Sequence, residues 1–127
     1  PMCDELIIGV GQNSEKNYLF SLDERMNFIL ETHNKEPKIK VLSFQGLTIN
    51  FCKNVNATAI VRGLRNPADF EFEKSVAQTN RRLSGIETLF LLTAADFSYI
   101  SSSIVREIIF HKGDYSSLVP EAVKNSR

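Results

Sequence analysis

The chain has 127 residues, and its 15 lysines and arginines are balanced by 15 aspartates and glutamates. This balance excludes the strongly basic surface that attracts nucleic acid or an anionic membrane. No segment reaches the roughly 20 apolar residues of a membrane-spanning helix. Cys3 and Cys52 form no spaced metal-binding pattern and suit a reducing cytosol, which predicts a cytoplasmic protein without a metal site of its own.

Strands and helices are expected to alternate along the chain. Short apolar runs predict strands at Glu5–Val10, Ile39–Phe44, Thr58–Val61 and Thr88–Leu92. Helices are predicted after Ser21, at Leu47–Asn54, from Pro67 to about Leu83, at Ser102–Lys112, and briefly from Pro120. This alternation is typical of a parallel sheet covered by helices. The sequence therefore predicts an α/β fold with a doubly wound parallel sheet in a single domain, residues 1–127.

Capping residues mark several of these helix ends. Ser21 and Glu24 have the spacing of a capping box. Asn66 before Pro67 is typical of an N-cap with proline at the first helical position. Gly46 predicts a turn, and Gly113 is expected at the C′ position of the helix that ends at Lys112.

Apolar spacing predicts which helix faces are buried. In the helix after Ser21, the expected buried stripe consists of Leu22, Met26, Ile29 and Leu30. In the helix at Leu47–Asn54, the residues expected on one apolar side are Leu47, Phe51 and Val55.

The segment VRGLRNPADFEFE, at residues 61–73, is the first candidate site. Arg62 and Arg65 are expected between the end of a strand and the start of a helix, where open α/β sheets bind ligands. Guanidinium groups suit bidentate contact with phosphate, and Gly63 allows close approach of the backbone. Two solvated loop arginines are the alternative.

The segment FSYISSSIVREI, at residues 97–108, is the second candidate site. Ser101, Ser102 and Ser103 are expected at the N-cap and first turn of a helix, where backbone N–H groups and the helix dipole favour an anion. An N-cap needs only one hydroxyl, so the two additional serines favour phosphate binding.

Together, RGLRNPADFEFE and YISSSIVRE resemble the phosphopantetheine adenylyltransferases of bacterial coenzyme A synthesis, in the nucleotidylyltransferase superfamily. The resemblance extends from Asp4 to about Val123. It implies a Rossmann-like nucleotidylyltransferase fold. The serine pattern marks the superfamily, whereas RGLR followed by ADFEFE is specific to the narrower family.

One family motif has no counterpart in this sequence. Members begin with a strand and a GTFDP-x-T-x-GH-like loop whose threonine and histidine contact the transferred phosphate. His33 and His111 lack these surroundings and are expected at helix ends or on the surface. The resemblance therefore implies that the first, central strand and the T-x-G-H loop precede Pro1, and that residues 1–127 alone are inactive.

The resemblance implies catalytic roles for Lys16 and Arg65. It implies that the phosphopantetheine substrate contacts Lys16, Thr48, Arg62 and Glu107. The residues implied to bind ATP are Gly63, Leu64, Arg65, Glu73, Phe97, Ser98, Tyr99, Ile100, Ser101, Ser102 and Ser103.

Each assignment has a structural alternative. Lys16 is otherwise a solvated loop lysine, Thr48 a helix-start residue, and Glu73 a charge favoured by the helix dipole, as are Asp69 and Glu71. Phe97 and Tyr99 either stack on adenine or pack. Glu107 is spaced for a surface contact with His111.

The resemblance implies that ATP and 4′-phosphopantetheine give dephospho-coenzyme A and pyrophosphate, with coenzyme A as a further ligand. Mg²⁺ is expected to bind mainly through the ATP phosphates, and the family implies a homohexamer. No nucleic acid or membrane partner is expected. The alternatives are a sister nucleotidylyltransferase with another acceptor, and a catalytically inactive module that binds coenzyme A or a nucleotide.

Overall fold

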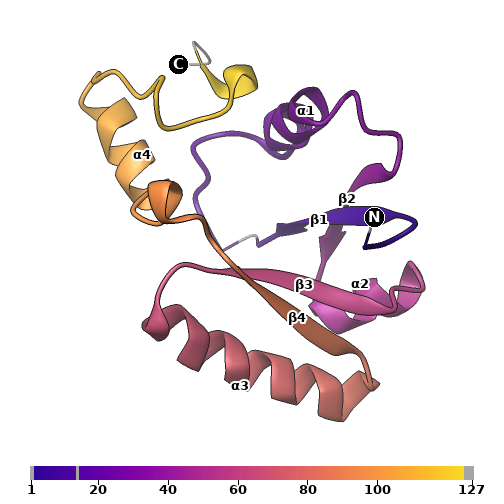
Figure 1. Ribbon diagram of the computed structural model, residues 1–127. Coiled ribbons are helices and arrows are strands. Elements are labelled where there is room, and N and C mark those ends of the chain that lie inside the picture. The colour runs from indigo at the N-terminus through magenta and orange to yellow at the C-terminus, as the bar shows by residue number, and fades with distance from the viewer. Residues whose placement is uncertain (1, 14, 125–127) are drawn as a thin grey trace. The chain divides into compact units, whose positions relative to one another are not determined.

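The computed structural model describes residues 2–13 and 15–124 (Figure 1). They form two compact units. Unit 1 comprises Pro1–Gly46 and Ser101–Arg127, and unit 2 comprises Leu47–Ile100. Each unit contains a two-stranded parallel sheet, so the predicted parallel pairing and the predicted α/β class are confirmed.

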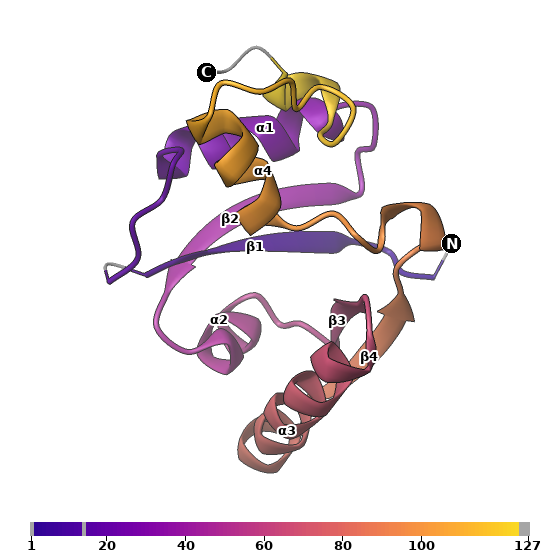
Figure 2. The same cartoon turned by 90° about the vertical axis from the view of Figure 1, so that its left-hand side faces the viewer.

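In unit 1, β1 (Leu6–Gln12) pairs with β2 (Ile39–Gln45). Their register runs from Leu6 opposite Ile39 to Gln12 opposite Gln45. Helix α1 (Leu22–Thr32) connects the strands and packs on β2 (Figure 2). At the carboxyl ends of the two strands, Gln45 Nε2 donates to Gln12 Oε1 at 3.0 Å.

The start of α1 is fixed by the predicted capping box. Ser21 Oγ accepts from the Glu24 N–H at 3.1 Å, and the Ser21 N–H donates to Glu24 Oε1 at 3.1 Å. The prediction of a buried stripe on α1 was wrong. Leu22, Met26 and Ile29 are only half-buried and Leu30 is 47% exposed, because the main packing partners of α1 are a two-stranded sheet and the short turn Glu121–Val123.

Unit 1 is completed by α4 (Ser102–Phe110) and a 3₁₀ turn, η2 (Glu121–Val123), which follows Pro120 as predicted. Gly113 is not the left-handed residue after α4. His111 is the C-cap, and Lys112 has the positive φ of 61°. A Cβ at Gly113 would lie 2.9 Å from Ile108 Cγ2, so the glycine is required by space.

Unit 2 contains a second strand–helix–strand arrangement, in which α3 (Pro67–Ser84) connects β3 (Ala59–Leu64) to β4 (Glu87–Leu92). Figures 1 and 2 both show α3 running beside these strands. Phe70 of α3 meets Phe90 of β4 edge to face, with ring centroids 6.0 Å apart. This contact helps to hold the beginning of α3 against the sheet.

The remaining elements of unit 2 are α2 (Thr48–Asn54) and a 3₁₀ turn, η1 (Ala95–Phe97). The apolar side predicted for α2 was wrong: Ile49 and Cys52 are buried, whereas Leu47 is 62% exposed. Leu47 is the extended N-cap and not part of the helix, and the buried face of α2 is formed by Ile49 and Cys52.

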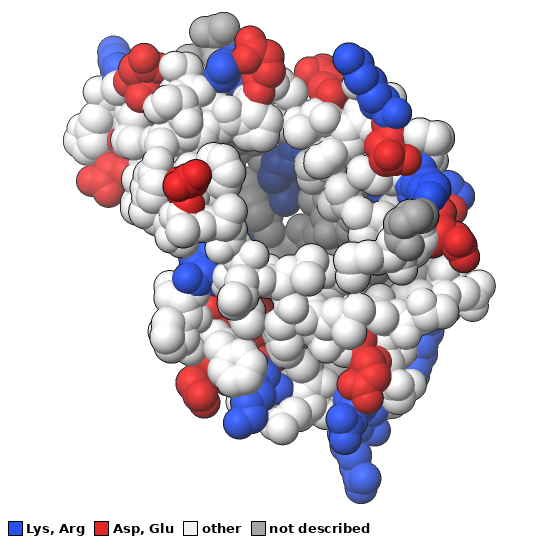
Figure 3. Space-filling view, viewed as in Figure 1, with Lys and Arg blue, Asp and Glu red and all other residues white. Residues whose placement is uncertain are grey.

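Acidic and basic side chains are interspersed over the face seen in Figure 3. Within residues 2–13 and 15–124, no helix combines the length and apolar character that crossing a membrane requires.

Candidate functional site

The connection from β3 to α3 carries the first predicted cluster. Strand β3 is longer than predicted and extends to Leu64, so Arg62 lies within the strand, opposite Phe90, and not after its end. Arg65 is the first residue beyond the strand. Asn66 is the N-cap of α3, as predicted, and its Oδ1 accepts from the Asp69 N–H at 2.9 Å.

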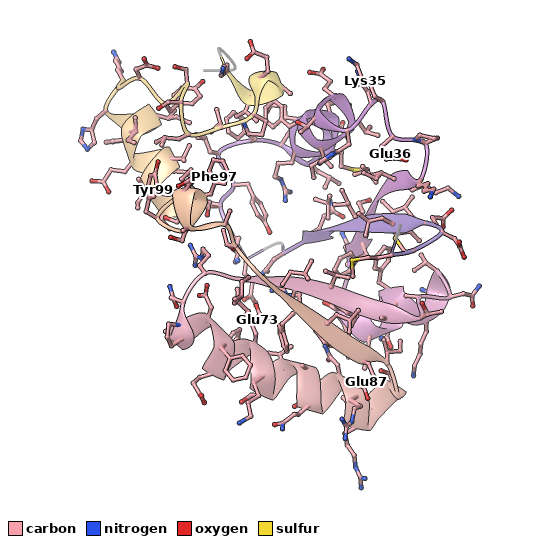
Figure 4. All side chains as sticks on the ribbon, viewed as in Figure 1. Lys35, Glu36, Glu73, Glu87, Phe97 and Tyr99 are labelled. Atoms are coloured by element: carbon pink, nitrogen blue, oxygen red, sulfur yellow. The ribbon has the colours of Figure 1, made fainter. Side chains whose placement is uncertain are left out.

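Arg62 is paired with Glu73 of α3. Its Nε donates to Glu73 Oε2 at 3.0 Å, and its Nη2 donates to Glu73 Oε1 at 2.5 Å. Figure 4 shows Glu73 directed from α3 toward the strands. The Glu73 side chain is only 14% exposed, whereas Arg62 is 54% exposed. The hydrogen bonds to Glu73 raise the pKa of Arg62 further above its usual value.

Arg65 is paired with Asp69 through both its side chain and its backbone. Asp69 Oδ2 accepts from the backbone N–H of Arg65 at 3.1 Å and from Nε at 3.0 Å. Oδ1 accepts from Nη2 at 3.4 Å. These hydrogen bonds hold the pKa of Asp69 below its usual range. Sequence reasoning treated Asp69 only as a charge near the helix dipole, because Arg65 precedes the helix and the four-residue spacing rule applies within a helix.

Both arginines are held along the same edge of the guanidinium group, the edge formed by Nε and Nη2. The carboxylates occupy Nε and Nη2, and no described residue accepts a hydrogen bond from Nη1. A guanidinium group offers five N–H donors in a planar fork that matches phosphate oxygens. In each arginine, a carboxylate therefore holds the Nε and Nη2 edge, while the outer edge at Nη1 has no partner among the described residues.

Neighbouring predicted residues of unit 2 differ in their accessibility. A Cβ at Gly63 would come no closer than 3.9 Å to Thr93 Oγ1, so the described residues do not fill the space beside this glycine. The Leu64 side chain is buried, and its carbonyl accepts from the Thr93 N–H at 2.8 Å. Thr48 is exposed and is the first residue of α2, as its structural alternative predicted.

The segment after β4 presents two exposed aromatic rings. Phe97, the last residue of η1, is 60% exposed, and Tyr99, which follows η1, is 64% exposed; both side chains are labelled in Figure 4. Ser98 Oγ donates to the Ala95 carbonyl at 3.1 Å, and the Ile100 N–H donates to the Phe97 carbonyl at 3.1 Å. These rings remain accessible for stacking within unit 2.

The three serines of unit 1 have different partners at the start of α4. Ser101 is the N-cap, and its Oγ accepts from the Ile104 N–H at 3.3 Å. Ser103 Oγ accepts from Arg106 Nη2 at 3.2 Å. The Ser102 hydroxyl has no hydrogen-bond partner among the described residues. Local structure therefore accounts for two of the serines, and Ser102 is the one whose hydroxyl is available to a ligand.

Lys16 and Glu107 are exposed residues of unit 1. Lys16 lies in the loop between β1 and α1, where its N–H donates to the Asn13 carbonyl at 3.0 Å. Glu107 accepts from the His111 N–H only through its backbone carbonyl. His33 and His111 are the C-caps of α1 and α4, so their predicted positions at helix ends are confirmed. The described residues contain no cluster of three or more His, Cys, Asp or Glu suited to a metal ion.

The chain belongs to the cytidylyltransferase-like proteins, since the model of that family matches residues 2–108. Within this class it is a member of the phosphopantetheine adenylyltransferase family. A protein named phosphopantetheine adenylyltransferase from Flavobacterium psychrophilum is 63% identical over 124 residues, which cover 98% of this chain and 82% of the relative.

Two further relatives have the same name. The protein from Christiangramia forsetii is 48% identical over 124 residues, covering 98% of this chain and 82% of the relative. The protein from Bacteroides thetaiotaomicron is 43% identical over 121 residues, covering 95% of this chain and 80% of the relative. The family resemblance inferred from RGLRNPADFEFE and YISSSIVRE is thus confirmed.

The pairing of Arg65 with Asp69 predicts a specific pH dependence. Because the folded-state pKa of Asp69 is depressed, the pair stabilises the fold above the unfolded-state pKa. This contribution is lost as the pH falls through the folded-state pKa. In Arg65→Ala, the Asp69 pKa measured by ¹³C NMR should rise but stay below the ordinary range, because the backbone N–H of residue 65 still donates. An unchanged pKa would contradict the pairing.

Proposed function

We propose that this protein transfers the adenylyl group of ATP to 4′-phosphopantetheine, giving dephospho-coenzyme A and pyrophosphate. The proposal is supported by membership of the phosphopantetheine adenylyltransferase family. The structural observation that carries it is the pair of arginines at the carboxyl end of β3, each with an Nη1 that no described residue contacts. Two such forks suit a reaction between two phosphorylated substrates.

In the proposed reaction, a phosphate oxygen of 4′-phosphopantetheine attacks the α-phosphorus of ATP. The new O–P bond forms as the bond from the α-phosphorus to the bridging oxygen breaks, and that oxygen leaves with its electron pair in pyrophosphate. The nucleophile is already an anion, so no strong base is required. The protein's task is to align two polyanions and to stabilise the charge on the phosphoryl oxygens.

The arginines and Lys16 supply the positive charge for this task. In our proposal Arg62 holds the phosphate of the acceptor, and Arg65 holds the phosphates of ATP. Lys16 contacts phosphopantetheine and neutralises charge on the bridging oxygen. Thr48 and Glu107 contact the pantetheine arm. The exposure of Lys16, Thr48 and Glu107 is compatible with these roles.

The nucleotide is proposed to contact a second group of residues. Ser102 and the N-terminus of α4 bind its phosphates, Phe97 or Tyr99 stacks on adenine, and Glu73 accepts from the nucleotide while keeping its pair with Arg62. The backbone from Gly63 to Arg65, and the segment from Ser98 to Ser103, complete the proposed ATP contacts.

Mg²⁺ bound to the ATP phosphates would neutralise part of their charge. The carboxylates of Asp69 and Glu73 are paired with arginines, and the described residues form no cluster of three metal-binding side chains, so a Mg²⁺ held by phosphate oxygens and water fits these residues better than one held in a carboxylate cage. We further propose that the enzyme acts in the cytoplasm as a homohexamer, in keeping with the family.

The activity is tested by measuring pyrophosphate release with ATP and 4′-phosphopantetheine. Release is expected only when both substrates are present, because the acceptor phosphate is the nucleophile. Pantetheine without its phosphate is the matched control acceptor. Absence of release, or equal release with pantetheine, would contradict the proposed function.

Replacing Arg65 should damage turnover much more than folding. The residue is 41% exposed, so Arg65→Ala loses little packing. Loss of a charge-stabilising donor at the reacting phosphates is expected to lower kcat by about 10²–10³. Arg82→Ala, at an exposed arginine in the last turn of the same helix, is the control and should retain full activity. Comparable kcat in Arg65→Ala would refute the role of Arg65.

Comparing Ser101→Ala with Ser102→Ala should distinguish helix capping from binding of ATP by the Ser102 hydroxyl. Ser102→Ala is expected to weaken ATP binding roughly 10-fold in calorimetry, because a hydrogen bond to a charged group is lost. The free energy of unfolding of Ser102→Ala should not change. Ser101→Ala should instead lower the free energy of unfolding by roughly 1 kcal/mol through the lost cap. Unchanged ATP affinity in Ser102→Ala would refute the proposed contact between the Ser102 hydroxyl and the nucleotide.

A further inference from the structure

Asp69 contacts Arg65 at three donors, which is more than an ordinary surface pair provides. Its carboxylate accepts from the Arg65 backbone N–H, from Nε and from Nη2, at 3.1, 3.0 and 3.4 Å. The hydrogen bond from the backbone N–H fixes the position of the Arg65 backbone relative to Asp69. The hydrogen bonds from Nε and Nη2 fix the orientation of the guanidinium plane. The same carboxylate thus restrains both ends of the Arg65 side chain.

Asp69 is itself held by the cap of α3. Its N–H donates to Asn66 Oδ1 at 2.9 Å, and it belongs to the first turn of the helix. Its side chain is 25% exposed. The orientation of Arg65 is therefore fixed relative to α3 by a continuous series of contacts from Asn66 through Asp69.

This restraint has a consequence for catalysis. A free arginine side chain has many rotamers, and a ligand must immobilise it at a cost in conformational entropy. With Nε and Nη2 already bound to Asp69, Arg65 presents the Nη1 edge before any substrate arrives. Preorganised donors contribute to transition-state stabilisation because they need no reorganisation during the reaction.

We propose that Asp69 is a positioning residue for adenylyl transfer, which directs the outer edge of Arg65 toward the phosphates of ATP. The inference rests on the proposed function of Arg65 but concerns a residue that touches neither substrate. Glu71 of the same helix provides a natural comparison. It is exposed, and no described residue contacts its carboxylate by a hydrogen bond or ion pair.

The test is a double-mutant cycle in the enzyme. Asp69→Asn keeps the size of the side chain and an acceptor for the Arg65 N–H, but it removes the charge. Because Arg65 would be misdirected, kcat is expected to fall about 10- to 100-fold, with the KM for phosphopantetheine unchanged. In an Arg65→Ala background, the same substitution should cause no further loss. Glu71→Gln, which removes one charge from the same helix, should leave kcat unchanged.

Two outcomes of the cycle would overturn the proposal. One is an unchanged kcat in Asp69→Asn. The other is an equal loss from Asp69→Asn with and without Arg65, because Asp69 would then act independently of that arginine. An equal loss from Glu71→Gln would likewise assign the effect to general charge and not to positioning.

A second measurement needs no variant at Asp69. The Nε–H resonance of Arg65 in ¹⁵N NMR spectra, assigned by its absence in Arg65→Ala, should exchange with water more slowly than that of Arg82. Equally fast exchange would overturn the pairing. An enzyme with a slowly exchanging Arg65 resonance but no pyrophosphate release would instead refute the proposed function, and the positioning role would fall with it.

Discussion

Two arginines at the end of β3 are each held along one edge by a carboxylate of α3, and the proposed chemistry depends on this arrangement. Arg62 is bound by Glu73, and Arg65 is bound by Asp69. Each pair uses Nε and Nη2, so the outer edge of each guanidinium group faces away from its carboxylate. The charges are partly exposed, so the pairs contribute little to stability, and their main effect is on orientation.

The charge balance of the chain makes this local arrangement necessary. With 15 basic and 15 acidic residues, no net field draws anionic substrates to the protein. Binding of two phosphorylated substrates must then depend on donors placed at particular positions. In our proposal these donors are the two arginines of unit 2, together with Lys16, the start of α4 and the Ser102 hydroxyl of unit 1. Because the chain belongs to the phosphopantetheine adenylyltransferase family, the reaction that we propose for these donors is adenylyl transfer to 4′-phosphopantetheine.

Local chemistry was predictable from the sequence, whereas burial was not. The Ser21–Glu24 capping box and the Asn66 cap were predicted because they depend on residues close in sequence. The buried side of α2 was missed because it depends on tertiary packing, and the length of β3 because strand ends depend on the partner strand. The role of Asp69 was missed because its contact with the Arg65 backbone requires the bend between β3 and α3. The assigned substrate contacts remain predictions.

The central claim is that the carboxylates keep the arginines oriented while the phosphates bind to their outer edges. A crystal structure of the enzyme with a non-hydrolysable ATP analogue tests it most directly. The account predicts that Arg65 keeps its Nε and Nη2 contacts with Asp69 and donates from Nη1 to a phosphate oxygen of the analogue. A structure in which Arg65 leaves Asp69 to bind the phosphates, or does not reach them, would contradict it.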